Sequence, residues 1–266
     1  NVDCKNYAAN NISIESKSKH KYIFIKSNIG NKEKIEQVFN KYKIDNIINF
    51  AAETHVDNSI INPEKVINNN INNFTKFLIQ FRKFYLEKKF SKNLKFINIS
   101  TDEVYGSLKL KEKSFNENSV YNPRNPYSAS KASIDHICSS FFSTFNLPII
   151  TVHFSNNFGP YQHDEKLIPT IIRNGIRGKK IPIYGKGTNI RDWMYVEDTG
   201  NAVEKVLKKG KIGQTYNFGG GEEFSNILIA KKICKILNEK IHNRKYDHKK
   251  LISFVEDRKG HDFRYS

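Results

Sequence analysis

The sequence is poor in cysteine and has no long apolar run. Its three cysteines, Cys4, Cys138 and Cys234, lie far apart and form no CxxC pair. A disulfide framework or zinc site is therefore not expected, no metal is predicted, and a reducing, cytoplasmic location is indicated. No apolar stretch approaches the roughly 18 residues of a membrane-spanning helix, so we predict no membrane partner. The first residues show no signal-peptide pattern.

Acidic residues are also scarce, with 27 Asp and Glu against 44 Lys and Arg, which gives a net charge of +17. Such an excess can indicate nucleic-acid binding. However, the lysines are scattered along the whole chain, and Asn and Ile are abundant beside them. No run of like charges and no aromatic RNA-binding signature occurs. We interpret the charge as compositional bias and predict no nucleic-acid partner.

Short apolar strands alternate with longer helical stretches, and this alternation predicts an α/β fold with a Rossmann-like, doubly wound parallel sheet. The chain of 266 residues is long enough for one large domain or two small ones. We predict an NAD-binding domain over residues 1–155 and a smaller mixed α/β, substrate-binding part over 156–266. Some segments of the second part are expected to return to the first. The predicted strands are 22–25, 46–52, 94–100 and 149–152, and the predicted helices are 32–42, 63–89 and 126–146.

Polar residues follow the predicted strands directly. Asp3, Glu53, Asp102 and Asn156 each come at or just after the end of an apolar run. Ligands of open parallel sheets bind beyond the carboxyl ends of the strands. These residues are therefore expected to line a binding site.

Tyr127 and Lys131 form a YxxxK pair at the start of a predicted helix, on one helix face. A nearby ammonium favours the phenolate of a tyrosine, so the pair can act as a general base on a sugar hydroxyl. Taken alone the signal is weak, because a packed Tyr with a solvated Lys has the same spacing.

Thr101, Asp102 and Glu103 place a hydroxyl and two carboxylates at the end of a predicted core strand. Adjacent carboxylates are also common at helix N-termini, which is the structural alternative. Two carboxyls in different environments can divide the roles of acid and base between them.

These motifs resemble those of the extended short-chain dehydrogenases/reductases, and within them the nucleotide-sugar branch of the dTDP-glucose 4,6-dehydratases. The resemblance runs from end to end, and Thr-Asp-Glu before Val-Tyr-Gly is specific to this branch. Related epimerases usually carry small or hydroxyl residues where Asp102 and Glu103 stand. The matching stretches are residues 51–57, 100–106, 126–131, 155–160, 165–169, 182–187, 191–193 and 257–262.

The resemblance implies a hydro-lyase that uses NAD and forms a 4-keto-6-deoxy sugar nucleotide. Tyr127 would take the C4 hydroxyl proton, with Lys131 lowering its pKa and holding the nicotinamide ribose. Thr101 would hydrogen-bond near the C4 oxygen. Glu103 would remove the C5 proton, and Asp102 would protonate the departing C6 hydroxyl. Hydride would pass from C4 to the cofactor and return at C6.

The resemblance also implies the binding residues and a homodimer, formed through helices near 63–89 and 126–145. Asp3 suits the adenosine ribose hydroxyls, which favours NAD over NADP. Arg191 and Arg258 suit a diphosphate, because guanidinium groups bind phosphate bidentately. The implied cofactor-binding residues are Asp3, Lys5, Asn6, Asn28, Ile29, Ala51, Ala52, Thr54, Asn69, Tyr127, Lys131 and Asn157. The implied substrate-binding residues are Glu53, Asn156, Lys166, Leu167, Pro182, Tyr184, Arg191, Asn217, Arg258 and His261.

The same resemblance implies that both ends of the family's chain are missing here. Family members open with a strand and a glycine-rich turn at the pyrophosphate, whereas Asn1 already corresponds to the second strand. Ser266 falls before the family's C-terminal end. Asn28, Asn69 and Phe158 also differ from the family's usual residues. The alternatives left open are an impaired fragment or remnant, a UDP-glucose dehydratase, an epimerase and a basic nucleic-acid-binding module.

Overall fold

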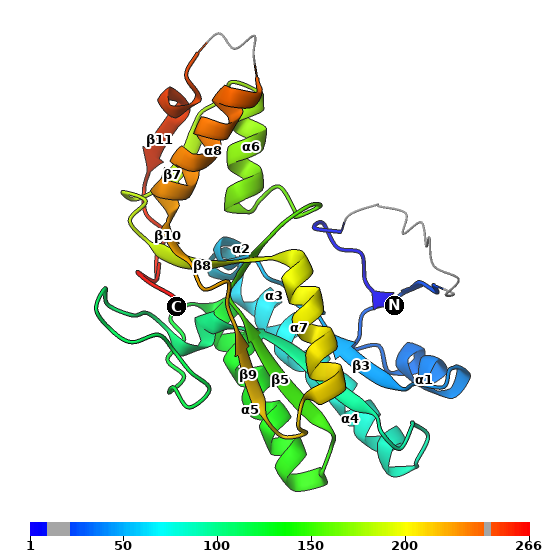
Figure 1. Cartoon of the computed structure of the whole chain (residues 1–266). Helices are drawn as coiled ribbons and strands as arrows, with labels where there is room; N and C mark the ends of the chain where they lie inside the picture. Colours follow the sequence, from blue (N-terminus) through cyan, green and yellow to red (C-terminus); the bar gives the residue numbers. More distant parts are fainter. Residues whose placement is uncertain (10–21, 242–245) are drawn as a thin grey trace.

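The computed structural model describes residues 1–9, 22–241 and 246–266. A parallel sheet of four strands forms its centre, in the order β3 (Asn46–Asn49), β4 (Lys95–Thr101), β5 (Ile149–Phe154) and β9 (Thr215–Phe218). Figure 1 shows helices on both faces of this sheet. The predicted α/β class with a Rossmann-like parallel sheet is confirmed.

One face of the sheet carries the helices α1 (Lys32–Lys41), α4 (Phe74–Leu86) and α5 (Pro126–Phe145). Their apolar sides meet β4 in an aromatic-rich core, where Phe81 and Phe96 are fully buried. Because side chains alternate along a strand, Phe96 faces this core while Ile97 faces the opposite one. The burial of this core anchors the strand that ends at Thr101.

The opposite face is covered by α7 (Val196–Lys209), drawn in yellow in front of the sheet in Figure 1. Ala202, Val203 and Val206 pack there against Ile97 and Ile150. Both α7 and β9 come from the range 156–266. Of these two elements, β9 is itself a strand of the main sheet and α7 packs against it.

The predicted helix over 63–89 is broken into three consecutive helical segments. These are α3 (Pro63–Ile67), a π-helix (Asn68–Asn73) and α4, and a short helix that was not predicted, α2 (Val56–Ile61), precedes them. The wider π turn carries Asn70, whose buried amide donates to the Glu53 carbonyl at 3.0 Å and to the Ser130 hydroxyl at 2.9 Å. Periodicity alone does not reveal such a local insertion.

A smaller unit stands above the strand ends. It holds the sheet of β6 (Asn156–Phe158), β8 (Ile190–Tyr195) and β10 (Glu223–Ser225), and the pair β7 (Ile181–Tyr184) and β11 (Ile252–Val255). Helices α6 (Leu167–Ile176) and α8 (Asn226–Lys240) pack on β7 around Ile171, Ile181 and Cys234. A short 3-10 helix (His248–Leu251) leads into β11. No helix among the described residues is long and apolar enough to cross a membrane.

The first strands form a separate parallel pair, β1 (Val2–Asp3) and β2 (Ile25–Lys26). The predicted strand over 22–25 therefore begins later than expected, at Ile25. Among the described residues, neither β1 nor β2 pairs with a strand of the main sheet.

Candidate active site

The chain turns sharply where β4 ends. Thr101 is the last strand residue, and a 3-10 helix, Asp102–Tyr105, follows at once. Gly106 then adopts φ +86°, and a Cβ there would lie 2.3 Å from the Asn122 carbonyl oxygen. The turn therefore needs glycine, and it holds the two carboxylates at the strand end.

Helix α5 starts beside this turn. Asn125 caps it, accepting from the Ser128 amide at 2.9 Å, and the Ser128 hydroxyl completes a capping box. Tyr127 lies in the first turn and is buried, and Lys131 follows one turn later. The Lys131 ammonium donates to the Ile99 carbonyl at 2.6 Å, which ties the helix to β4.

The predicted catalytic residues meet at this point. The Tyr127 hydroxyl hydrogen-bonds with Thr101, and the Thr101 hydroxyl donates to an Asp102 carboxylate oxygen at 3.3 Å. Burial raises the pKa of Tyr127, and the charges of Glu103 and Asp102 raise it further. Tyr127 therefore holds its proton until positive charge is brought close to it.

The two adjacent carboxylates lie in different surroundings. Burial, and then the charge of Glu103, raises the pKa of Asp102 to about 8. Its Oδ2 atom is buried with no hydrogen-bond partner among the described residues. Glu103 lines a cavity between the main sheet and the smaller unit, whereas Asp102 lines a different one of about 410 Å³. At neutral pH the Asp102 carboxyl therefore keeps its proton.

The cavity that Glu103 lines has a volume of about 330 Å³. Three of its lining residues have a buried polar atom without a partner among the described residues, namely Asn156 Oδ1, Trp193 Nε1 and Arg258 Nε. Unsatisfied donors and acceptors that line a cavity indicate a polar ligand. The predicted substrate-binding residues that line this cavity are Asn156, Lys166, Leu167, Pro182, Tyr184, Arg191, Arg258 and His261.

The two arginines that line this cavity differ in their contacts. Arg258 lies 3.8 Å from the Asp57 carboxylate, while Arg191 stacks on the Tyr265 ring and donates to the carbonyls of Ile190 and Asp262. Burial, and then the charge of Arg258, lowers the pKa of His261 to about 4, so His261 is neutral at pH 7.

Two predicted substrate residues lie outside this cavity. Glu53 accepts from the Asn6 side chain at 3.2 Å, on the side of the sheet where β1 lies. Asn217, on β9, accepts from the Tyr105 hydroxyl at 3.0 Å. The structure therefore separates these two from the other predicted substrate residues.

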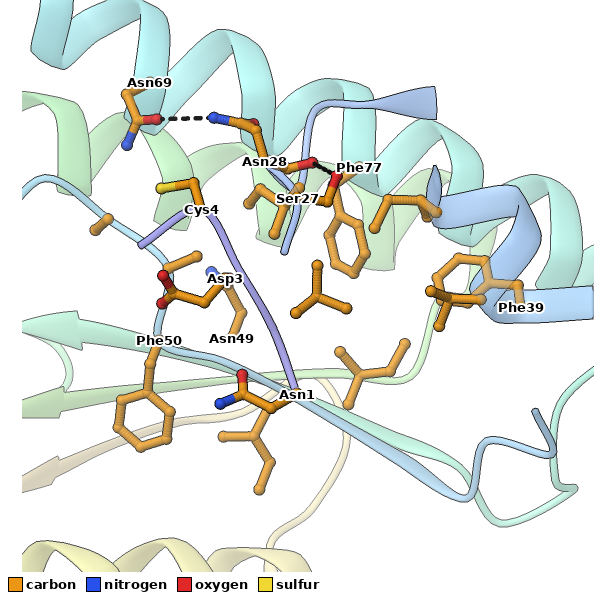
Figure 2. A pocket seen from close by; sticks show the side chains of 18 of the residues that line it. Asn1, Asp3, Cys4, Ser27, Asn28, Phe39, Asn49, Phe50, Asn69 and Phe77 are labelled. Carbon is orange, nitrogen blue, oxygen red and sulfur yellow. Dashed lines mark hydrogen bonds between the residues drawn. The ribbon is translucent and has the colours of Figure 1, made fainter. Parts of the chain in front are cut away.

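A second cavity, of about 460 Å³, lies between β1, β2 and β3. Figure 2 shows Asp3, Asn28 and Asn69 at this cavity, with the Asn28 amide donating to the Asn69 carbonyl oxygen at 3.3 Å. Phe39 and Phe77 lie on its apolar side. The predicted cofactor residues that line it are Asp3, Asn6, Asn28, Ile29, Ala51, Ala52 and Asn69.

The lining of this second cavity fits a dinucleotide in part. Asp3 offers a carboxylate at the end of a parallel strand, which suits ribose hydroxyls, and the amides of Asn28 and Asn69 suit polar ring edges. Lys131 and Tyr127, which the resemblance places near the nicotinamide ribose, do not line this cavity. No glycine-rich turn lines it among residues 1–9, 22–241 and 246–266.

The remaining predicted cofactor residues lie elsewhere. Lys5 stacks over the Phe24 ring at 4.8 Å, and Thr54 lines the cavity of Glu103. Asn157 hydrogen-bonds through its side chain to Thr199 and to the Ser155 carbonyl. A residue absent from the predictions, Tyr265, lies at the site, where its hydroxyl donates to Asp262 Oδ2 and lies 3.4 Å from Glu103 Oε2. Tyr265 reaches the site because residues near 262–266 fold back toward β4.

Comparison with known proteins bears on this geometry. The profile of the GDP-mannose 4,6 dehydratase family matches residues 2–266. A dTDP-glucose 4,6-dehydratase of Haemophilus influenzae is 44% identical over all of this chain and 80% of its own length. One of Salmonella typhimurium is 41% identical over all of this chain and 76% of its own length.

The chain belongs to the dTDP-glucose 4,6-dehydratase family. A crystal structure of the Bacillus anthracis dTDP-glucose 4,6-dehydratase, in complex with NAD, superposes with a TM-score of 0.83 at 38% identity. It matches 100% of this chain and 77% of that protein. The family membership predicted from the motifs at 101–103 and 127–131 is thereby confirmed.

Proposed function

We propose that this protein is an NAD-dependent hydro-lyase that converts dTDP-glucose to its 4-keto-6-deoxy sugar nucleotide. The observation that carries this proposal is the contrast between Asp102 and Glu103 beside Tyr127. Asp102 keeps a proton at neutral pH, while Glu103 lines the cavity with the unsatisfied polar atoms. An acid and a base on adjacent residues suit the loss of water from neighbouring carbons.

The first role in the reaction belongs to Tyr127. Bound NAD supplies a reversible hydride acceptor. Tyr127 takes the proton of the C4 hydroxyl, and its hydrogen bond with Thr101 fixes the phenol for this transfer. Lys131, held on β4 by the Ile99 carbonyl, brings the positive charge that favours the phenolate. Such general-base catalysis contributes roughly 10²–10⁴ in rate.

The second role is shared by the carboxylates. A ketone at C4 makes the C5 proton acidic, and Glu103 removes it. Asp102 gives its proton to the C6 hydroxyl, which leaves as water. Loss of water leaves a C5–C6 double bond, whose reduction would need the hydride back from the cofactor at C6 and a proton at C5, which Glu103 is placed to return.

The division of the chain supports two binding functions. Residues 1–155 supply the cavity that fits a dinucleotide in part and that we assign to NAD, and residues 156–266 supply most of the cavity that we assign to the nucleotide-sugar. In the latter, Arg258 suits the diphosphate, because its buried Nε has no partner among the described residues. Tyr184 and His261 lie edge to face in the same cavity, with ring centroids 6.2 Å apart.

We also propose that the protein acts as a homodimer in a reducing, cytoplasmic compartment. Ile67, Ile79 and Leu86 are exposed on the helical segments between 63 and 86, where a partner would cover them. All three cysteines are free thiols. Sedimentation of the purified protein tests the dimer: a monomer at all concentrations would contradict it.

The function is tested by incubating the protein with NAD and dTDP-glucose and measuring the alkali-induced absorbance of a 4-keto sugar. UDP-glucose and GDP-mannose serve as comparison substrates. We expect the protein to convert dTDP-glucose faster than either of them, or to convert dTDP-glucose alone. NAD binding is measured separately by titration. A protein that binds NAD but forms no 4-keto sugar from any of the three overturns the proposal.

A further inference from the structure

A buried acid lies behind the catalytic helix and has no role in the reaction proposed above. Asp135 lies on α5, four residues after Lys131, and is 5% exposed. Its Oδ1 accepts from the Asn98 amide at 3.0 Å, and its Oδ2 accepts from the Ser100 hydroxyl at 2.7 Å. Both donors belong to β4, the strand that ends at Thr101.

Residues of neighbouring elements also contact the Asp135 carboxylate. His153 Nε2, on β5, lies 2.9 Å from Asp135 Oδ2, and the ring is 1% exposed. The Tyr121 hydroxyl lies 3.4 Å from the same oxygen and 3.0 Å from His153 Nε2. The other ring nitrogen, Nδ1, faces the Tyr105 hydroxyl and Asn217 Oδ1. A buried carboxylate with this many partners is fixed in position and shielded from water.

Asp135 follows Lys131 by one turn of α5, so the two charged side chains share one helix face. Lys131 is buried, and burial lowers the pKa of its ammonium. The charge of Asp135 is the largest influence in the opposite direction, with Cys138 next. The Ile99 carbonyl accepts one of the three ammonium hydrogens. A buried lysine needs a paired negative charge to remain an ammonium.

We propose that Asp135 is a positioning residue that keeps Lys131 charged and fixed on β4. Asn98 and Ser100 hold the Asp135 carboxylate, and the Ile99 carbonyl between them holds the Lys131 ammonium. Three successive residues of one strand thus set the distance between the two charges. The catalytic consequence rests on the proposed function, because a neutral Lys131 would no longer favour the Tyr127 phenolate.

The direct test measures the charge of Lys131 without substrate. Lysine is labelled with ¹³C at Cε, and the Lys131 signal is identified as the one missing from Lys131→Met. Wild-type Lys131 is expected to stay an ammonium through neutral pH. Asp135→Asn is expected to lower its pKa by at least about one unit, a tenfold change in the protonation equilibrium. An unchanged titration in Asp135→Asn overturns the inference.

Matched variants separate charge from packing. Ser100→Ala removes one hydrogen bond to Asp135 but leaves its charge, and Asp135→Glu keeps the charge at a shifted position. Both are expected to leave Lys131 protonated at neutral pH. If Asp135→Asn does not fold, the wild-type titration still decides, since a neutral Lys131 at pH 7 contradicts the inference.

The kinetic test follows where wild-type turnover is present. Asp135→Asn is expected to lower kcat at least about tenfold at neutral pH, leave KM unchanged, and move the alkaline limb of kcat to lower pH. A purely structural role would lower kcat equally at every pH, and that result would also overturn the inference. Absence of wild-type turnover would contradict the proposed function alone, because the lysine titration is independent of it.

Discussion

At the scale of single residues, neighbours in sequence receive different chemistry from the fold. Asp102 and Glu103 share a 3-10 turn, yet the pKa of Asp102 is raised to about 8 by burial, and then by Glu103. Its Oδ2 has no partner among the described residues, so no hydrogen bond stabilises the charged form there. The sequence indicates that two carboxyls are present, but only the packing around them separates acid from base.

The raised pKa of Asp102 sets the pH dependence of turnover. A general acid works while it is protonated, so kcat is expected to fall as the pH rises above about 8. Asp102→Asn is expected to lower kcat by roughly 10²-fold or more, because the leaving C6 hydroxyl loses its proton donor. Rapid-quench analysis would then find a 4-keto sugar that retains its C6 hydroxyl. Equal pH profiles for wild type and variant would contradict this role.

Arg258 offers a second residue-scale prediction. Arg258→Lys is expected to raise KM about tenfold or more with little change in kcat, because an ammonium cannot bind a diphosphate bidentately. Steady-state kinetics with dTDP-glucose measures both constants. The control is Arg177→Lys, at an exposed position on the end of α6. A loss confined to kcat would place Arg258 outside substrate binding.

At the scale of elements, α5 and β4 are the parts most fully anticipated. Pro126 and the apolar face of the following residues predict the helix, and the run over 94–100 predicts the strand. The π-helix over Asn68–Asn73 was not predicted, because it depends on Asn70 reaching Glu53 and Ser130, far away in sequence. The spacing of apolar residues predicts local structure, whereas this π-helix depends on contacts with residues from other parts of the fold.

The N-terminal cap of α5 is expected to support both stability and activity. Asn125→Ala removes the acceptor for the Ser128 amide at a buried position and is expected to cost about 1–2 kcal/mol. Because Tyr127 lies two residues after the cap, kcat should fall as well. Urea unfolding and steady-state kinetics measure the two effects. Asn31→Ala, which uncaps the exposed start of α1, is the control and should leave kcat unchanged.

At the scale of the whole molecule, the last described residues join the two units. Arg264 pairs with Glu223 of β10 through two hydrogen bonds of 2.6 and 2.7 Å, and donates to the Glu112 carbonyl at 2.7 Å. Its own carbonyl accepts from the Leu108 amide at 3.0 Å. The loop after the catalytic turn is thereby tied to the smaller unit, and Tyr265 is brought to Glu103.

Loss of this tie is expected to weaken the molecule as a whole. Arg264→Met should lower the free energy of unfolding by about 2 kcal/mol, because it removes a buried guanidinium that donates to the Lys109 and Glu112 carbonyls as well as to the exposed Glu223 carboxylate. The hydrogen bond from Arg264 lowers the pKa of Glu223. The contribution of the Arg264–Glu223 pair to the free energy of unfolding is therefore fully present above the pKa that Glu223 has in the unfolded chain. It is lost as the pH falls through the lower pKa that Glu223 has in the folded protein.

The contribution of the Arg264–Glu223 pair is measured by comparing how the stability of wild type and of Glu223→Gln depends on pH. Urea unfolding of wild type should weaken as the pH falls below about 4.5, the ordinary value for glutamate. Glu223→Gln should flatten part of that dependence. If both proteins lose stability in parallel, the pair does not contribute to it.

The site residues that belong to short sequence motifs were predicted. Those that come to the site only through contacts between distant parts of the chain were missed. Thr101, Tyr127 and Lys131 were predicted from two short motifs, and the structure brings them together. Asp135 and Tyr265 escaped notice, since an acid inside a helix and a tyrosine near the last residue look ordinary in sequence. Their positions depend on contacts across more than 30 residues, which periodicity and local motifs do not encode.

The path of the chain has one more consequence. After β5 ends at Phe154 the chain builds β6, α6, β7 and β8, and then returns to the main sheet with α7 and β9 before completing the smaller unit. A single crossover between two genes of this kind would therefore divide the main sheet or separate the two parts of the smaller unit. Recombination that exchanges sugar preference must splice at several junctions, around Phe154, Val196 and Phe218, which favours evolution of specificity by point substitution.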